Sequence, residues 1–211
     1  MQRATGADRP RASMTAEKRV PRADVAIRNF AEQPSVSLQM DKFRKSGTGL
    51  AIGGAIVFIG VLFVSAYWES DIRWLHFVQS WMYLAAIALM LRGSRWGYFI
   101  GTGAALFWDY VNVFVTTFLK NGLAQTHLLV HTGHMTRPDQ FLSVPGWFGN
   151  LAVIVGSVVA YAATPRKQRG DVLRFGFASL ATTLFFALTM YLCQPRYLAL
   201  FPASLHPHLR I

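Results

Sequence analysis

Five apolar stretches of this sequence are each long enough to cross a lipid bilayer as a helix. The hydrocarbon core of a bilayer is about 30 Å thick, so a helix needs roughly 20 apolar residues to span it. A spanning segment must also satisfy its backbone hydrogen bonds internally, which favours helices. We therefore expect an all-α integral membrane protein, a bundle of about five transmembrane helices. The predicted spans are residues 48–68, 72–91, 96–119, 147–164 and 172–193.

The composition agrees with this class of protein. Hydrophobic residues make up 53% of the chain and charged residues only 15%. A protein surface that faces lipid is stable without charged side chains, which accounts for the low charged fraction. Cys193 is the single cysteine, so a disulfide within the chain is excluded.

Polar segments flank the predicted transmembrane domain of residues 47–193. Residues 1–46 are basic and poor in apolar residues, and we predict a disordered cytoplasmic tail. Residues 194–211 are predicted to form an outer tail, because three prolines argue against another helix. Residues 122–134, in the longest connection, predict a short helix that lies on the outer membrane surface.

The distribution of basic residues predicts the orientation. The net charge is +11, and ten of the 21 Lys and Arg residues precede Gly47. With a cytoplasmic N-terminus, sixteen of the 21 lie on the inner side. The positive-inside bias then predicts a protein of the cell membrane with its N-terminus inside and its C-terminus outside. No nucleic-acid-binding motif accompanies this charge, so the lipid bilayer is the expected partner and nucleic acid is not.

The third stretch carries an acid near its middle. Gly97, Gly101, Ala105 and Asp109 repeat every four residues, so they share one helical face. Asn112 and Thr116 continue the same stripe. A carboxylate at membrane depth costs about 2.5–3.5 kcal/mol on insertion scales, so it usually has a partner or lines a polar cavity. The stripe predicts close helix packing at one end and a polar site at the other.

The second stretch offers partners for that site. His76, Gln79 and Tyr83 fall on one helical face, which should point toward other helices because lipid would leave it unpaired. The predicted intramembrane polar site comprises His76, Gln79, Tyr83, Asp109, Asn112 and Thr116. The alternative is structural: a protonated Asp109 that is hydrogen-bonded to its neighbours and fixes helix packing.

Three histidines follow the third stretch. His127, His131 and His134 are spaced i, i+4, i+7, and two histidines one helical turn apart can share a Zn or Cu ion. This spacing predicts a site for a metal or haem, to which His206 and His208 offer further ligands. The alternative is an interfacial helix whose histidines contact headgroups and water. No H-E-x-x-H sequence, the signature of a zinc protease, is present.

Two other patterns concern packing. Gly49 and Gly53 form a G-x-x-x-G pair, which is typical of closely packed membrane helices, and Gly54 and Gly60 add small surface. Aromatic residues near membrane interfaces are usually anchors or lipid-facing. We apply that interpretation to Trp74, Trp81, Trp96, Trp108 and Trp147.

These features support three functional hypotheses, and the sequence leaves open whether the protein is an enzyme. The first is a small multi-pass protein that binds a metal or small polar ligand, as a homo-oligomer or as a subunit of a membrane complex. The second is a proton- or cation-coupled transporter that uses Asp109. The third is a membrane enzyme that acts on a lipid-like substrate through Asp and His acid–base chemistry.

Overall fold

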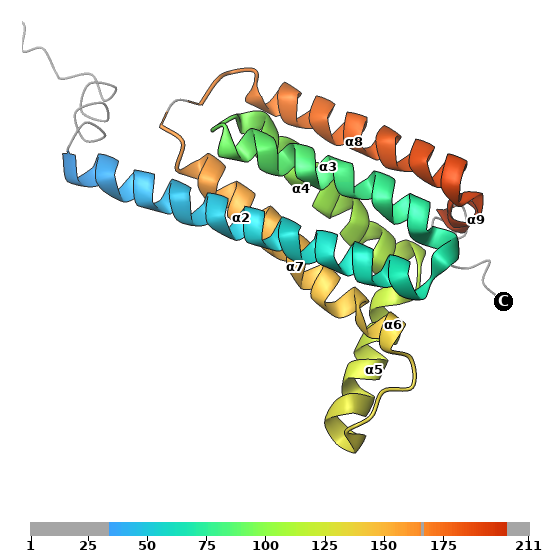
Figure 1. Cartoon of the computed structure of the whole chain (residues 1–211). Helices are drawn as coiled ribbons and strands as arrows, with labels where there is room; N and C mark the ends of the chain where they lie inside the picture. Colours follow the sequence, from blue (N-terminus) through green and yellow to red (C-terminus); the bar gives the residue numbers. More distant parts are fainter. Residues whose placement is uncertain (1–33, 166, 202–211) are drawn as a thin grey trace, which may run out of the picture. The chain divides into compact units, whose positions relative to one another are not determined.

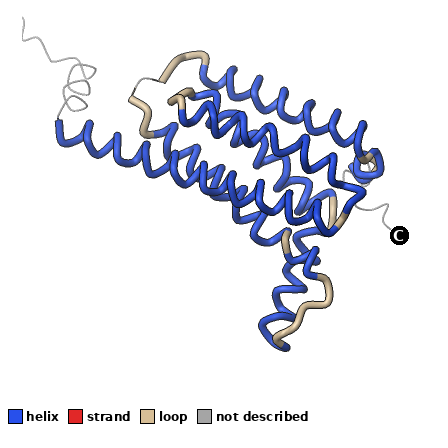
Figure 2. Tube along the Cα trace, viewed as in Figure 1, coloured by secondary structure: helices blue, strands red, loops and turns tan. Residues whose placement is uncertain are grey.

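Helices make up all the regular secondary structure in residues 34–165 and 167–201, the part of the chain that the computed structural model describes (Figure 2). Residues from Leu38 onward form one compact unit, and the helix packing and cavities described below belong to that unit. The elements are α2 (Pro34–Trp68), the 3₁₀ turn η1 (Ser70–Ile72), α3 (Arg73–Leu91), α4 (Arg95–Tyr110), the π-helical turn η2 (Val111–Val115), α5 (Phe118–Thr132), α6 (Pro138–Phe141), α7 (Ser143–Ala162), α8 (Asp171–Cys193) and α9 (Pro195–Leu198).

The helix α4 contacts α3, α7 and α8, so it lies inside the bundle (Figure 1). Small residues permit this close packing. A Cβ atom added at Gly97 would lie 2.6 Å from the Met90 nitrogen, and one added at Gly101 would lie 3.3 Å from the Val153 side chain. The close packing predicted for this face of the third stretch is confirmed.

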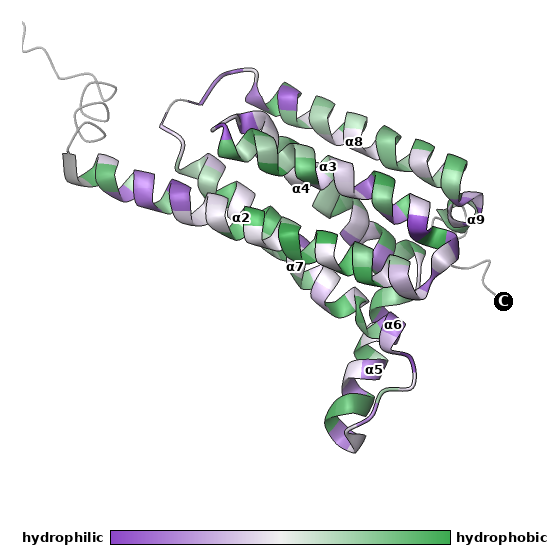
Figure 3. Ribbon diagram, viewed as in Figure 1, coloured by the Kyte–Doolittle hydropathy of each residue, from purple (hydrophilic) through white to green (hydrophobic). Residues whose placement is uncertain are grey.

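Four helical segments are long and apolar enough to cross a membrane: Val36–Trp68, Ser70–Leu91, Pro138–Ala162 and Asp171–Cys193. Their outward faces are apolar (Figure 3), as Leu180, Leu184 and Leu188 of α8 illustrate, each more than half exposed. Such faces are stable in contact with lipid and unfavourable in contact with water. These four helices agree with the expectation of an integral membrane protein.

The third predicted stretch, residues 96–119, is interrupted. The helix α4 ends at Tyr110, and the π-helical turn η2 ends at Val115. Thr116 then adopts an extended conformation, while its amide and hydroxyl both donate to the Val111 carbonyl oxygen at 2.9 and 3.0 Å. The prediction of one helix to residue 119 was wrong, because the β-branched residues between 111 and 117 disfavour a continued α-helix.

The helix α2 begins at Pro34 and not at residue 48, so residues 34–46 are helical where a disordered tail was expected. Proline is favoured in the first helical turn, and Asp41 pairs with Arg44 and Lys45 one turn further on. These local interactions extend the helix beyond the apolar stretch. The remainder of the predicted tail, residues 1–33, lies outside the described residues.

The helices α2 and α7 run antiparallel and touch through glycines, with Gly47 against Gly156 and Gly54 against Gly149. A Cβ added at Gly54 would lie 2.4 Å from the Gly149 oxygen, whereas one added at Gly53 meets nothing within 4 Å among the described residues. The expectation that Gly49 and Gly53 form the packing surface was therefore wrong. The glycines that pack are seven residues apart, about two helical turns, which keeps them on one face.

The helix α5 confirms the short helix predicted near residues 122–134, although it starts earlier, at Phe118. It ends at Gly133, whose φ of 71° is left-handed, as is common where helices terminate. Figure 1 shows α5 pointing away from the bundle formed by α3, α4, α7 and α8.

Candidate functional site

A cavity of about 260 Å³ opens where α2 ends and α3 begins, and η2 forms part of its wall. We call it the His76 cavity. Its lining includes the apolar side chains of Phe58, Leu62, Leu75, Val111 and Met190. Its polar lining residues come from several elements and the turns between them: Ser65, Glu69, His76, Asn112, Asn121, Arg137, Asp139, Gln140, Ser143 and Tyr197.

One lining residue of the cavity, Trp108, has a buried hydrogen-bond donor without an acceptor among the described residues. Trp108 is only 6% exposed, and its indole Nε1 has no hydrogen-bond partner among the described residues. A buried donor of this kind costs about 1–3 kcal/mol unless something accepts from it. The interpretation of Trp108 as an interface anchor was wrong, because its ring packs against Phe58 and Phe186 inside the bundle.

His76, another lining residue, offers a hydrogen-bond acceptor where Trp108 offers a donor. Its Nδ1 lies 3.0 Å from the Leu62 carbonyl oxygen, which can only accept, so Nδ1 carries the proton in this hydrogen bond. The neutral ring then has its lone pair on Nε2. The imidazole is therefore a candidate acceptor or base at the cavity wall, held in place by the backbone of α2.

The π-helical turn supplies two wall residues, Val111 and Asn112. Asn112 is 8% exposed, and its side-chain amide can both donate and accept. Single π turns within helices occur frequently at functional sites. The same β-branched run that ends α4 thus places an amide in the cavity wall.

Charged residues surround one side of the cavity. Arg137 donates to both carboxylate oxygens of Asp139, at 3.0 and 2.7 Å, and Glu69 lies nearby. Burial raises the pKa of the Glu69 carboxyl, and the neighbouring carboxylates of Asp139 and Asp71 raise it further. The hydrogen bonds to Asp139 raise the pKa of the Arg137 guanidinium. This rim is therefore charged, whereas the floor is mostly apolar.

The predicted polar site divides into two groups. His76 and Asn112 line the cavity, whereas Gln79, Tyr83 and Asp109 are not among its lining residues. Thr116 uses its hydroxyl to accept from the Phe118 amide and to donate to the Val111 carbonyl. The structure thus brings two of the six predicted residues together at one cavity.

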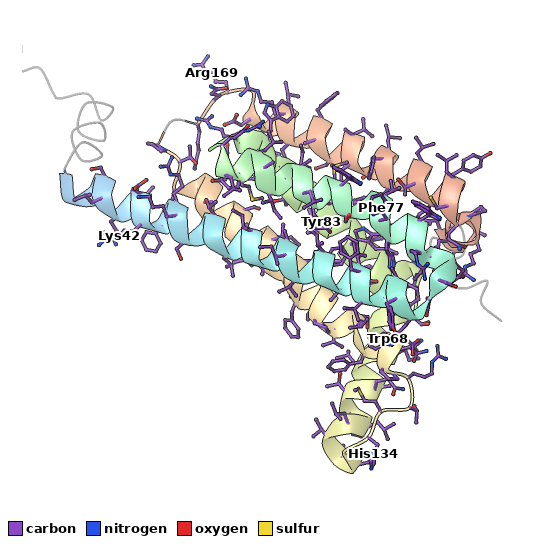
Figure 4. The ribbon with its side chains drawn as sticks, in the orientation of Figure 1. Lys42, Trp68, Phe77, Tyr83, His134 and Arg169 are labelled. Carbon is purple, nitrogen blue, oxygen red and sulfur yellow. The ribbon has the colours of Figure 1, made fainter. Side chains whose placement is uncertain are left out.

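Asp109 belongs to a buried polar cluster with residues of α3 and α7. The Tyr83 hydroxyl, at the centre of the bundle in Figure 4, donates to Asn150 Oδ1 at 2.9 Å. The Asp109 carboxylate is close enough to both residues to interact with them. Neither of its oxygens has a hydrogen bond of good geometry to the described residues, and the same holds for Asn150 Nδ2 and both Gln79 amide atoms.

The three histidines of the predicted metal site lie on or just after α5. The rings of His127 and His131 are 4.1 Å apart, and His134 lies at the tip of α5 in Figure 4. Within residues 34–165 and 167–201, no group of three or more His, Cys, Asp or Glu residues could hold a metal ion. The structure therefore gives no support to a site for Zn, Cu or haem at these residues. His206 and His208 lie outside the described residues.

At the opposite end of the bundle, Asp171 is a buried acid whose importance the sequence did not reveal. Its side chain is 2% exposed and accepts from Arg95 at 2.8 Å, from the Tyr161 hydroxyl at 3.1 Å and from the Gln168 amide at 2.9 Å. Asp171 thereby joins the start of α4, the end of α7 and the start of α8. The acid at the first position of an apolar helix was the available signal, because that position favours negative charge.

Comparisons with known proteins add no family or fold. No family model matches the chain, and no match is found among the curated proteins or the solved structures.

Proposed function

We propose that this chain is a multi-pass membrane protein that binds a small, mostly apolar ligand in the His76 cavity. The ligand's polar end carries a carbonyl-type oxygen that accepts a hydrogen bond. Two observations carry this proposal together: Trp108 is a lining residue of the cavity, and its buried indole N–H has no acceptor among the described residues. Asn112 provides a second donor in the same wall.

The chemistry of the cavity favours such an amphiphile. Most sites for small molecules are apolar clefts in which a few polar groups fix the ligand's orientation. Here Phe58, Leu62 and Met190 contribute apolar surface, whereas Glu69 and the Arg137–Asp139 pair form a charged rim. Apart from these three charged residues, the described lining carries no formal charge, so an uncharged ligand fits better than a charged one.

The orientation and the fifth crossing belong to the same proposal. The α4–η2 segment, Arg95 to Val115, is about 31 Å long at 1.5 Å per residue, which matches a hydrocarbon core. With α4 as a fifth crossing and the positive-inside bias, the N-terminus is cytoplasmic and the His76 cavity opens near the outer surface.

An enzyme is the second candidate, and the His76 geometry favours it. A histidine with Nδ1 bonded to a backbone carbonyl has Nε2 free to act as a base, and His76 is a lining residue of the cavity. Asp109 does not line that cavity, so the base would be His76 alone. The transport hypothesis has less support, because Asp109 is not among the residues that line the cavity.

The binding proposal is tested with a matched pair of probes, menadione and 2-methylnaphthalene, which share a two-ring shape. Only menadione has carbonyl oxygens. We expect the purified full-length protein in detergent to bind menadione more tightly. Trp108→Phe, which removes the indole N–H, should weaken menadione binding about fivefold, because one neutral hydrogen bond contributes about 1 kcal/mol.

The control variant is Trp81→Phe, at a residue of α3 that is 57% exposed. It should leave the affinity for both probes unchanged. Equal affinity of the wild-type protein for the two probes, or equal loss in the two variants, would contradict the proposal.

A further inference from the structure

A second cavity, of about 290 Å³, lies near the amino end of α2, away from the His76 cavity. We call it the Arg44 cavity. It is lined by Arg44, Gly93, Arg95, Tyr98, Thr164 and Pro165. Two of these six residues are arginines and none is acidic.

From this lining we infer that the Arg44 cavity binds a phosphate group, and that the phosphate belongs to the headgroup of an anionic lipid. Guanidinium groups suit this ligand, because their planar donors match two phosphate oxygens at once. The inference is independent of the ligand proposed for the His76 cavity.

The walls of the cavity are held in place before any ligand arrives. Asp171 accepts from Arg95 at 2.8 Å and is itself fixed by Tyr161 and the Gln168 amide. Tyr98 is 5% exposed, and its hydroxyl lies 2.8 Å from that of Thr48. A site whose donors are already ordered loses less conformational freedom when a ligand binds.

Arg44 is the lining residue that would donate hydrogen bonds to the phosphate. It donates from one nitrogen to Asp41 at 2.6 Å, and its side chain is 43% exposed. A guanidinium has five N–H donors, so this bond leaves others for a phosphate. Asp41 is not among the lining residues, and none of the described residues that line the cavity is a carboxylate.

The position of the lining residues distinguishes a lipid from a soluble phosphate. Arg44 precedes the apolar stretch of α2, Gly93 and Arg95 flank the turn between α3 and α4, and Thr164 follows α7. All of these positions are at the ends of apolar helices, where a bilayer places its headgroups. Figure 4 shows Lys42 and Arg169, two further bases, toward this end of the bundle. In the orientation proposed above, this end of the bundle is cytoplasmic. Basic pockets between transmembrane helices on the cytoplasmic side are suited to anionic headgroups.

The test measures the affinity of the full-length protein in a nonionic detergent for three ligands at constant ionic strength. Dioctanoyl phosphatidylglycerol has both chains and phosphate, dioctanoylglycerol has the chains alone, and inorganic phosphate has the anion alone. We expect at least tenfold tighter binding of phosphatidylglycerol than of dioctanoylglycerol, because charge-assisted hydrogen bonds contribute about 1.5–3 kcal/mol. Inorganic phosphate binding as tightly as phosphatidylglycerol would keep the phosphate site and assign it to a soluble anion.

The variant Arg44→Gln should weaken phosphatidylglycerol binding about tenfold, whereas Lys42→Gln should change it less than twofold. Lys42 is a matched control because it is an exposed base of the same helix and does not line the cavity. Arg44→Lys keeps the charge without the planar donors, so an approximately threefold loss is expected and decides the case if Arg44→Gln does not fold. Equal affinity for phosphatidylglycerol and dioctanoylglycerol, an unchanged affinity in the Arg44 variants, or an equal loss in Lys42→Gln would overturn the inference.

Discussion

The two ends of the helical bundle differ in whether their buried polar groups have hydrogen-bond partners. At the end where α4 and α8 begin, Asp171 is buried but accepts hydrogen bonds from Arg95, Tyr161 and the Gln168 backbone. At the other end, Trp108 Nε1 is buried beside a cavity and has no acceptor among the described residues. The buried polar group of the first end has its partners within the protein, whereas the buried donor of the second end has none among the described residues, and we propose that a ligand supplies its acceptor.

The packing of α2 against α7 follows the same division. Toward the Asp171 end, these helices meet backbone to backbone at Gly47 and Gly156. Toward the other end, Val61 and Gly146 both line the His76 cavity, and a side chain separates the helices there. Close contact at one end and a side-chain-lined opening at the other let one pair of helices serve both stability and binding.

The largest expected effect is at Asp171. The substitution Asp171→Asn keeps the size of the side chain and removes the charge that compensates Arg95. Breaking a buried ion pair by removing one partner usually costs about 3–5 kcal/mol, so we expect the free energy of unfolding to fall by about 3 kcal/mol. Unfolding in mixed micelles, followed by tryptophan fluorescence, measures this change.

The control for that prediction is Asp71→Asn at the opposite end. Asp71 pairs with Arg196 at 2.6 Å, but both side chains are more than half exposed. Exposed pairs contribute about 0–1 kcal/mol, so this variant should change stability little. An equal loss of unfolding free energy in the two variants would show that the Asp171 pair contributes no more to stability than the exposed Asp71 pair.

The next effect concerns the contact between α2 and α7. The variant Gly54→Ala places a Cβ atom 2.4 Å from the Gly149 oxygen, so the helices must separate. Overpacking of this kind costs about 1–3 kcal/mol. In the neighbouring variant Gly53→Ala, the added Cβ meets no described residue within 4 Å. This variant should stabilise the helix by about 0.5–1 kcal/mol, since alanine is the better helix former. The free energy of unfolding, measured for both variants and the wild type, checks this prediction. Changes of the same sign in the two variants would show that α2 packs through another face.

These residues also show what could be predicted from the sequence. The membrane class, most of the helices and the short helix near residues 122–134 follow from apolar length and helical spacing, both local properties. The length of α4 did not follow, because the segment that includes Val111, Val113 and Val115 forms a π turn, and Thr116 bonds back to the Val111 carbonyl. Apolar length alone cannot detect that local competition.

Side-chain partners were harder to predict than helices. Gly49 and Gly54 are both small residues of one apolar stretch, and only the position of α7 decides which of them packs. Trp108 resembles an interface anchor by composition, yet it is buried against Phe58 and Phe186. Asn150 had no distinguishing pattern around it, although it accepts from Tyr83. Such choices depend on which helix faces which, and a single helical stripe does not contain that information.

The smallest expected effect tests the charged rim of the His76 cavity through its pH dependence. Burial and the neighbouring Asp139 and Asp71 raise the pKa of Glu69 above its ordinary value of 4.5. The folded state therefore binds this proton more tightly than the unfolded state does, so stability falls as the pH rises from 4.5 through the folded pKa. The variant Glu69→Gln cannot ionise, so its unfolding temperature should exceed that of the wild type at neutral pH and match it near pH 4. The difference should be modest, because the rim is partly open to solvent. Thermal unfolding of both proteins across pH 4–8 measures it, and a variant that is less stable than the wild type at neutral pH would show that the Glu69 carboxylate is stabilised by Arg137 more than it is penalised by burial.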